Sequence, residues 1–181
     1  SQRKFYYKES TDTLMNVEWF GSLIYKRPKK LSTKFSPSID TIKYLIKKYN
    51  ICLHDLIFIL EPTSPLRNIK DILKAKKLLT SKKVNTVCSF TTSWTNPFRT
   101  WKKNQLKMIN YTPIGKKFLS RQQLPNFYQA TGHVIAFKLK KKLKNILSNK
   151  VNFIMIEKER GIDIDDLLDY KICKLIYEKK L

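Results

Sequence analysis

Glycine is scarce in this sequence: only four glycines occur in 181 residues, and they lie far apart at positions 21, 115, 132 and 161. A loop that cradles phosphates through its backbone needs several glycines close together, after a strand and before a helix. No stretch of the sequence offers such a group. The printed sequence therefore contains no glycine-rich loop that could bind a nucleoside triphosphate.

Cysteine is also rare, and the three cysteines, Cys52, Cys88 and Cys173, are odd in number and widely spaced. Without a CxxC pair, the sequence predicts neither a zinc site nor a framework of disulfides. Cys88 falls in a strand-like run and is most simply a small core residue. No apolar run reaches the length of a membrane span, and no signal-peptide pattern opens the sequence. We therefore expect no membrane association and a reducing, cytoplasmic location.

Acidic residues are few: fourteen Asp and Glu stand against thirty-seven Lys and Arg, which gives a formal net charge of +23 at pH 7. Such a charge first suggests nucleic acid as a partner. Only six of the basic residues are arginine, although specific readers of bases and phosphates favour the guanidinium fork. The even spread of lysine favours a genome-wide coding bias over nucleic-acid binding. A lysine-rich nucleic-acid-binding module, with aromatic residues for stacking, stays an alternative.

The stretch 56–67, LIFILEPTSPLR, is the part of the sequence around which we expect the fold to be organised. Its five leading apolar residues are typical of a strand buried on both faces of a parallel sheet. A polar turn follows, and Asn68 is placed to cap a helix that begins at Ile69. Ligands of open α/β sheets gather at such strand-to-helix loops. The loop 61–67 is thus a pocket wall or an ordinary turn, and spacing alone favours the turn.

The rest of the chain alternates between strand and helix patterns. We expect strands at 5–8, 23–26, 86–90, 134–137 and 153–156, and helices at 10–20, at 37–49 behind a Ser36 cap, at 139–147 and after Asp165 or Asp166. This alternation predicts an α/β fold with a mostly parallel sheet in one domain, residues 1–181. Residues 91–128 break the pattern with many aromatic residues and prolines, which indicates a functional excursion or a partner-binding arm.

Two acidic residues near the C-terminus, Asp163 and Asp165, could bind a metal ion. They are two positions apart, so in an extended chain both carboxylates point to the same side. Two converging oxygen donors suit Mg²⁺, which usually shares its coordination with substrate phosphates. The simpler alternative is a helix cap, because Asp165 or Asp166 just precedes the last helix. Three carboxylates within four positions repel one another unless a cation lies among them, which favours metal binding.

Two further residues could carry chemistry, each with a simpler interpretation beside it. Arg121 could hold a carboxylate or a phosphate through two parallel hydrogen bonds, but an exposed arginine without a partner is the simpler interpretation. His133 lies at the start of a predicted strand, where a lone histidine is more often a structural hydrogen-bonding residue than a base or a ligand. No Ser/His/Asp arrangement can be assembled from the sequence.

Three motifs, ILEPTSPLRNIKDI, SRQQLPNFYQATGHVIAF and GIDIDDLLDYKI, resemble in order and spacing those of the acylneuraminate cytidylyltransferase family, the CMP-sialic acid synthetases and their relatives. The resemblance spans nearly the whole chain. It implies a Rossmann-like nucleotidyltransferase fold. It also implies that CTP reacts with a nine-carbon nonulosonic sugar acid to give a CMP-sugar and pyrophosphate, with Mg²⁺ as cofactor, for surface glycan biosynthesis.

The resemblance also implies roles for residues of this chain. Asp163 and Asp165 would be the catalytic residues that hold Mg²⁺ against the phosphates. Residues 91–128 would include the dimerisation arm of a homodimer. The expected substrate-binding residues, of which the first three would line the sugar pocket, are Glu61, Thr63, Ser64, Arg121, Gln122, Thr131 and Gly132.

The chain departs from the family pattern at three places. Glu61 stands where the family usually has glutamine, and the pair Thr131-Gly132 stands where Asn-Gly is common. The family also begins with a strand, a basic glycine-rich CTP loop of the type ARGGSKGIPxKN and a helix, which the printed sequence lacks. We expect the chain to be a fragment; a catalytically incomplete remnant is the alternative. The sugar stays open among sialic, legionaminic, pseudaminic and 3-deoxy-octulosonic acids.

Overall fold

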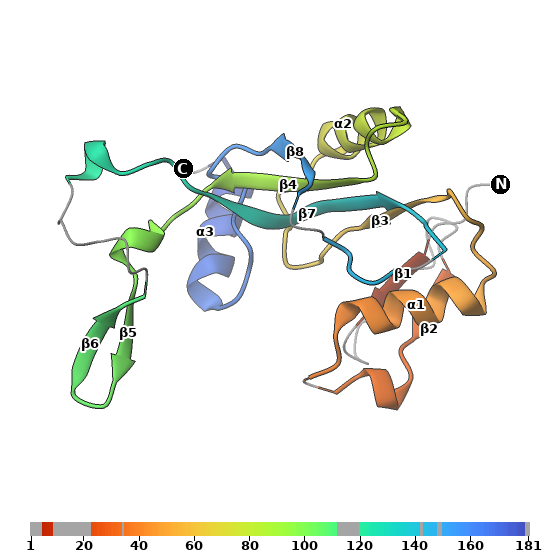
Figure 1. Cartoon of the computed structure of the whole chain (residues 1–181), viewed down its shortest axis with the longest axis horizontal. Coiled ribbons are helices and arrows are strands. Elements are labelled where there is room, and N and C mark those ends of the chain that lie inside the picture. The colour runs from red at the N-terminus through yellow and green to blue at the C-terminus, as the bar shows by residue number, and fades with distance from the viewer. Residues whose placement is uncertain are drawn as a thin grey trace. The chain divides into compact units, whose positions relative to one another are not determined.

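A computed structural model describes residues 5–8, 23–33, 35–111, 120–141, 143–147 and 150–179. The chain divides into two compact units, whose elements are labelled in Figure 1. The first unit comprises Ser1–Leu53 with Lys141–Asn145, and the second comprises His54–Lys140 with Ile146–Leu181. The predicted helix at 10–20 lies outside the described residues.

The first unit contains a small parallel sheet and one α-helix. The strands β1 (Phe5–Lys8) and β2 (Leu23–Lys26) pair in parallel, which confirms both predicted strands. A short 3-10 helix, η3 (Lys29–Leu31), and then α1 (Ser38–Lys48) follow.

Helix α1 begins one residue later than the sequence predicts. Pro37 has an extended ψ of 141° and is itself the N-cap, so the helix starts at Ser38. The Ser36 hydroxyl does not cap the helix. It accepts a hydrogen bond from the Thr33 amide at 3.2 Å and lies 2.7 Å from the Thr33 hydroxyl, which closes a local turn before the helix.

The second unit is built on a four-stranded sheet. In spatial order its strands are β3 (Leu56–Ile59), β7 (Tyr128–Lys138), β4 (Thr86–Thr92) and β8 (Asn152–Met155). Strands β3, β4 and β8 share one direction, whereas β7 runs against them between β3 and β4. The predicted parallel sheet is therefore mixed: only β4 and β8 pair in parallel, because the chain returns from residues 93–127 as an antiparallel strand.

Helix α2 (Ile69–Thr80) packs on this sheet and forms the core of the second unit. Its buried residues Ala75 and Leu79 join a cluster with Val87 of β4, Val134 of β7 and Ile154 of β8. Full burial of one such side chain contributes roughly 1.5–3 kcal/mol. Figure 1 shows α2 on one side of the sheet and the last helix, α3 (Leu167–Tyr177), on the other.

The predicted start of α2 and the predicted place of Cys88 are both confirmed. The side chain of Asn68 accepts the Asp71 amide and the Asp71 side chain accepts the Asn68 amide, which forms a capping box. Cys88 is fully buried in β4. Burial, together with the negative charge of Glu61, raises the pKa of the Cys88 thiol to about 11. An un-ionised buried thiol is inert, as the core interpretation requires.

The predicted helix at 139–147 is wrong, because its described residues, 139–141 and 143–147, form no helix. The backbone of Leu139 instead bonds to the chain before β3: its amide donates to Asp55 and its carbonyl accepts from His54, both at 2.9 Å. These long-range bonds keep Leu139 extended. Lys140 and Lys144 would also stand four apart in a helix, where like charges repel.

Residues 91–128 contain structure that periodicity did not predict. The strands β5 (Trp101–Asn104) and β6 (Lys107–Asn110) form an antiparallel hairpin, with Gln105 in the left-handed region at φ 49°. Two 3-10 turns, η4 (Pro97–Arg99) and η5 (Arg121–Gln123), flank it. No helix in the described part of the chain is long and apolar enough to cross a membrane.

Candidate functional site

Arg67 holds the loop after β3 against strand β7. Its Nη2 donates to the carbonyls of Glu61 at 2.6 Å and Gly132 at 3.0 Å, and its Nε donates to the carbonyl of His133. The Glu61 amide also donates to the Gly132 carbonyl at 3.0 Å. A planar guanidinium presents such a fork of donors, whereas an ammonium group does not. The loop 61–67 is therefore fixed in position on the strand beside it.

Strand β7 is irregular where it meets this loop. Its register with β4 shifts on either side of Ser89, whose hydroxyl takes the place of regular backbone bonds. The Ser89 hydroxyl accepts from the Thr131 hydroxyl at 2.7 Å and the Val134 amide at 3.0 Å, and it lies 3.1 Å from both of their carbonyls. Such bulges re-aim the chain and are frequent beside active sites. Here the bulge carries the predicted residues Thr131 and Gly132.

Gly132 has no room for a side chain. A Cβ atom at this position would lie 2.6 Å from Ser64 Oγ, 2.9 Å from Glu61 Cβ and 3.0 Å from Glu61 Oε2. Contacts this short do not occur with real side chains, so the close approach requires glycine. The structure thus brings together three of the predicted substrate-binding residues, with the glutamate and serine side chains lying over the glycine.

The GIDID segment reaches the same place from the other end of the chain. Ser64 Oγ donates to Asp163 Oδ1 at 3.3 Å, and the Ile164 amide donates to the Thr63 carbonyl at 2.8 Å. Ser64 is buried, and Asp163 is partly buried. The predicted residues Thr63, Ser64 and Asp163 are therefore neighbours, although 99 positions separate Ser64 from Asp163.

Asp165 has a different environment from Asp163. It is exposed, and its amide donates to Asp169 Oδ2 at 3.1 Å. The next residue, Asp166, is the N-cap of α3 and forms a capping box with Asp169. The helix-cap alternative therefore holds for Asp166, while Asp163 lies against the loop after β3. No group of three or more potential metal ligands of the His, Cys, Asp or Glu type occurs within the residues that the structure describes.

A buried ion pair lies directly behind the loop. Arg160 donates from Nη1 to Asp71 Oδ2 at 2.8 Å and from Nη2 to Asp71 Oδ1 at 3.1 Å, and its Nη1 also reaches the Leu66 carbonyl at 3.1 Å. Burial alone would raise the pKa of Asp71, but hydrogen bonds from Arg160 and the Asn68 amide outweigh it and hold that pKa below its ordinary value. The bond to Asp71 likewise raises the pKa of Arg160.

His133 is packed inside this network. Its side chain is fully buried, and neither ring nitrogen makes a well-aligned hydrogen bond among the described residues. Burial lowers the pKa of His133, the positive charge of Arg67 lowers it further, and Asp71 opposes the shift only in part. His133 is therefore neutral near pH 7. Its burial and neutrality fit the structural interpretation that the sequence favoured, with the Leu66 backbone as its polar neighbour.

Two predicted residues, Arg121 and Gln122, lie in the turn η5. Gln122 is exposed, and the side chain of Arg121 lies outside the described part of the structure. Within this turn, Gln123 Oε1 accepts hydrogen bonds from the amide and the hydroxyl of Ser120, both at 3.1 Å. The substrate-binding roles of Arg121 and Gln122 stay predictions.

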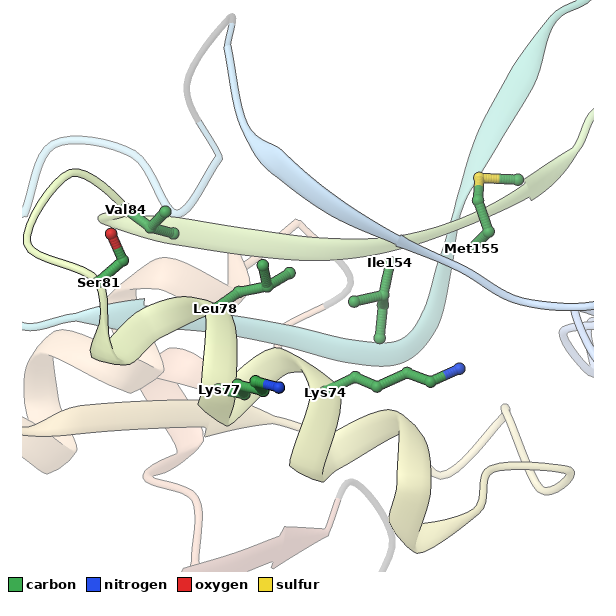
Figure 2. Close-up of a pocket in the computed structure, with 7 residues that line it drawn as sticks. All are labelled: Lys74, Lys77, Leu78, Ser81, Val84, Ile154 and Met155. Atoms are coloured by element: carbon green, nitrogen blue, oxygen red, sulfur yellow. The ribbon is translucent and has the colours of Figure 1, made fainter.

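An open groove lies elsewhere in the second unit, between α2 and the edge strand β8. It has a volume of about 600 Å³ and is lined by Lys74, Lys77, Leu78, Ser81, Val84, Ile154 and Met155. Figure 2 shows Lys74 and Lys77 on the helix and Ile154 on the strand that faces it. No predicted site residue lines this groove, so it is distinct from the place where the motifs meet.

Sequence reasoning gave the side chains of Arg67, Asp71 and Arg160 no role in assembling this site, although Arg67 and Asp71 lie in the first motif. One signal was available. Arginine is rare in this lysine-rich chain, so each of the six arginines is a candidate for a role that needs a guanidinium group. Two of the six, Arg67 and Arg160, make the multiple hydrogen bonds that lysine cannot reproduce.

Comparison with known proteins agrees with the motif pattern. The chain is 27% identical over 181 residues to an N-acylneuraminate cytidylyltransferase of Escherichia coli O18:K1:H7 (strain RS218 / NMEC), covering 91% of this chain and 39% of that protein. It is 21% identical over 169 residues to post-translational flagellin modification protein B of Campylobacter coli, covering 91% of this chain and 72% of the relative. No family model matches the chain. The predicted resemblance to acylneuraminate cytidylyltransferases is confirmed.

Proposed function

We propose that this chain belongs to a cytidylyltransferase that transfers CMP from CTP to a sialic-type, nonulosonic sugar acid and releases pyrophosphate. One observation carries the proposal: the first and third motifs meet through Ser64 and Asp163 at 3.3 Å and through Thr63 and Ile164 at 2.8 Å. The second motif brings Gly132 to the same place. Motifs far apart in sequence that converge at the carboxyl end of a strand are what a substrate site requires.

The residues at this convergence would bind the sugar acid. Glu61 and Thr63 are partly exposed and would offer side-chain oxygen atoms to sugar hydroxyls. Ser64, Thr131 and Gly132 are buried and would hold the loop in position behind them. Arg121, with Gln122, would bind the carboxylate of the sugar acid. The sugar's anomeric oxygen would attack the α-phosphorus of CTP in line, while the bond to the pyrophosphate oxygen breaks and the hydroxyl proton leaves to a base.

We propose that Asp163 and Asp165 hold a magnesium ion. Mg²⁺ is usually held by one or two carboxylates, with waters and substrate phosphates completing its coordination, so a cage of three protein ligands is not needed. Asp163 would be one ligand, oriented by the Ser64 hydroxyl, and the exposed Asp165 would be the other. When bound, the ion neutralises the charge that grows on the phosphate oxygens and on the leaving pyrophosphate.

We also propose that the protein forms a homodimer through the arm at 91–128 and works in the cytoplasm. The β5–β6 hairpin carries exposed apolar side chains at Trp101, Leu106, Met108 and Ile109, which suit a protein interface. The free state of Cys52, Cys88 and Cys173 suits a reducing compartment.

The decisive experiment measures pyrophosphate release by the complete protein with CTP, Mg²⁺ and a panel of nonulosonic acids. We expect turnover with one of these acids. Asp163→Asn should lower the turnover about 10²–10³-fold, the usual effect of removing one preorganised charge-stabilising group. Asp40→Asn, which alters an exposed carboxylate on α1, is the matched control and should keep full activity. Normal turnover by a folded Asp163→Asn variant would end the metal assignment.

Two other outcomes would point to the alternative functions. Calorimetry that detects binding of neither CTP with Mg²⁺ nor any sugar acid would identify an incomplete remnant of the family. Binding to single-stranded DNA that weakens steeply as salt is raised, without pyrophosphate release, would instead favour the nucleic-acid-binding module.

A further inference from the structure

We infer that Arg160 and Asp71 are positioning residues that hold Asp163 in the orientation in which it takes a divalent cation. The inference rests on the proposed function for the identity of the cation site. The hydrogen bonds that link Arg160 and Asp71 to the chain around Asp163 involve residues outside the acidic pair Asp163 and Asp165.

Arg160 joins three parts of the second unit through one guanidinium. It belongs to the turn that leads into Asp163, and its Nε donates to Glu157 of the same turn at 2.7 Å. Its Nη1 reaches the carbonyl of Leu66 in the loop after β3, and both of its Nη atoms bind the carboxylate of Asp71 in the first turn of α2. The turn is thereby tied both to the loop and to the helix.

Asp71 provides a rigid anchor for this tie. Its side chain is only 2% exposed, and Oδ2 also accepts the Asn68 amide at 3.1 Å in the capping box. The helix that carries Asp71 is fixed to the sheet through Ala75 and Leu79, which are fully buried in the core. The core therefore fixes the position of Asp71, and Asp71 in turn fixes the position of Arg160.

Contacts beyond Arg160 restrict the chain up to Asp163. A Cβ atom on Gly161 would lie 2.7 Å from the Cβ of Thr91, so the backbone here is pressed against β4. Ile162 is buried, and the Ile164 amide is bonded to Thr63. Asp163 thus stands between two fixed neighbours and faces Ser64. A carboxylate placed in advance loses less conformational entropy when it binds an ion.

The tie depends on the shape of the guanidinium and not only on its charge. Lysine at position 160 would keep the positive charge beside Asp71 but could not bind both of its oxygens and the Leu66 carbonyl at once. Arg160→Lys should therefore loosen Asp163 while leaving a cation in place for the buried carboxylate. Asp71→Asn loosens the same tie from the other side and keeps an oxygen for the Asn68 amide.

The test compares these two variants of the complete protein with Lys70→Gln, which removes an exposed charge next to Asp71. The first measurement is amide hydrogen exchange at Ile164, and the second is the affinity for Mn²⁺ alone, used as a spectroscopic substitute for Mg²⁺. We expect exchange at Ile164 to become at least about tenfold faster in both variants. We expect Mn²⁺ affinity to fall about 10–100-fold, as when supporting partners of metal ligands are removed. The acceleration at Ile164 should exceed that at Val134 in the sheet, whose exchange reports global unfolding. All properties of the Lys70→Gln variant should stay unchanged.

Each outcome decides the matter. If either variant folds and keeps the Mn²⁺ affinity and Ile164 exchange of the wild type, the inference is overturned. It is also overturned if Mn²⁺ binding falls only in proportion to the unfolded fraction, because the two residues would then be merely structural. Failure of the wild type to bind Mn²⁺ overturns it as well. If Mn²⁺ binding depends on Arg160 but the protein releases no pyrophosphate, the positioning role is supported. Only the proposed reaction is then contradicted.

Discussion

Two regions of the second unit distribute charged and apolar residues in opposite ways. In the junction, defined as the loop 61–67 and the segment 157–164 with the first turn of α2, the central charged pair lies inside: Arg160 is only 23% exposed and Asp71 only 2%. In the hairpin β5–β6, large apolar side chains lie outside, with Leu106 fully exposed and Met108 60% exposed. The geometry of the junction is therefore set by the chain itself, whereas the hairpin exposes a surface that suits a partner.

The largest effect on stability should come from breaking the ion pair of the junction. Arg160→Ala leaves the Asp71 carboxylate buried without its cation, which typically costs about 3–5 kcal/mol in free energy of unfolding. Urea unfolding followed by circular dichroism measures this loss. Lys174→Ala, which breaks the exposed Lys174–Glu178 pair at 3.9 Å, is the control and should cost at most about 1 kcal/mol. Equal losses in the two variants would contradict the special role of the buried pair.

A smaller loss should follow from filling the space over Gly132. In Gly132→Ala the new methyl group would meet Ser64 Oγ and Glu61 Cβ, so the loop after β3 must shift. Such overpacking typically costs about 1–3 kcal/mol. Urea unfolding checks the cost, and Ala130→Ser, an exposed position on the same strand, should stay within about 0.5 kcal/mol of the wild type. An unchanged midpoint in Gly132→Ala would show that the loop does not press on β7.

The buried histidine should make stability depend on pH. Because the pKa of His133 is lower in the folded state than the ordinary 6.5, the unfolded chain binds a proton that the folded chain does not. The contribution of His133 to the free energy of unfolding should therefore be constant above about pH 6.5 and fall as the pH drops below that value. A second fall, below pH 3.8, should follow as Asp71 becomes protonated. His54→Asn changes the exposed histidine, which has φ 71°, and should keep the fall in the free energy of unfolding below about pH 6.5. If this variant loses that fall, the pH dependence belongs to His54 and not to His133.

The smallest effect on stability should come from the hairpin. Met108→Lys changes an exposed side chain, so the free energy of unfolding of the monomer should move by less than about 0.5 kcal/mol. If the hairpin forms the proposed dimer interface, the same change should shift the mass measured by sedimentation from dimer toward monomer. Lys102→Gln, on the neighbouring strand and on the opposite face of the hairpin from Met108, should leave the dimer intact. A protein that is already monomeric before mutation would remove the interface from the proposal.

The amino-acid sequence determined the features that depend on neighbouring residues. The apolar run at 56–59 formed β3, and Asn68 formed the capping box of α2 with Asp71 three residues later. The prediction that this strand is buried on both faces of a parallel sheet is wrong, because β3 is a partly buried edge strand of its sheet and pairs antiparallel with β7. The last helix likewise began behind Asp166. The three motifs pointed to the residues that converge at the loop after β3, and the similarity to known proteins confirmed the resemblance that they predicted. Such features can be read in advance because their hydrogen bonds and caps span only a few residues.

Only the tertiary structure decided the features that depend on distant residues. The place of β7 between β3 and β4 and the extended path of Leu139 follow from backbone bonds to distant strands, which override local helix preference. The same holds for Arg67 and Arg160, whose carbonyl and carboxylate acceptors include Gly132 and Asp71, more than sixty positions away in the chain. Sequence spacing gives no information about such partners, because a buried charge is stabilised by whatever the fold brings within hydrogen-bonding distance.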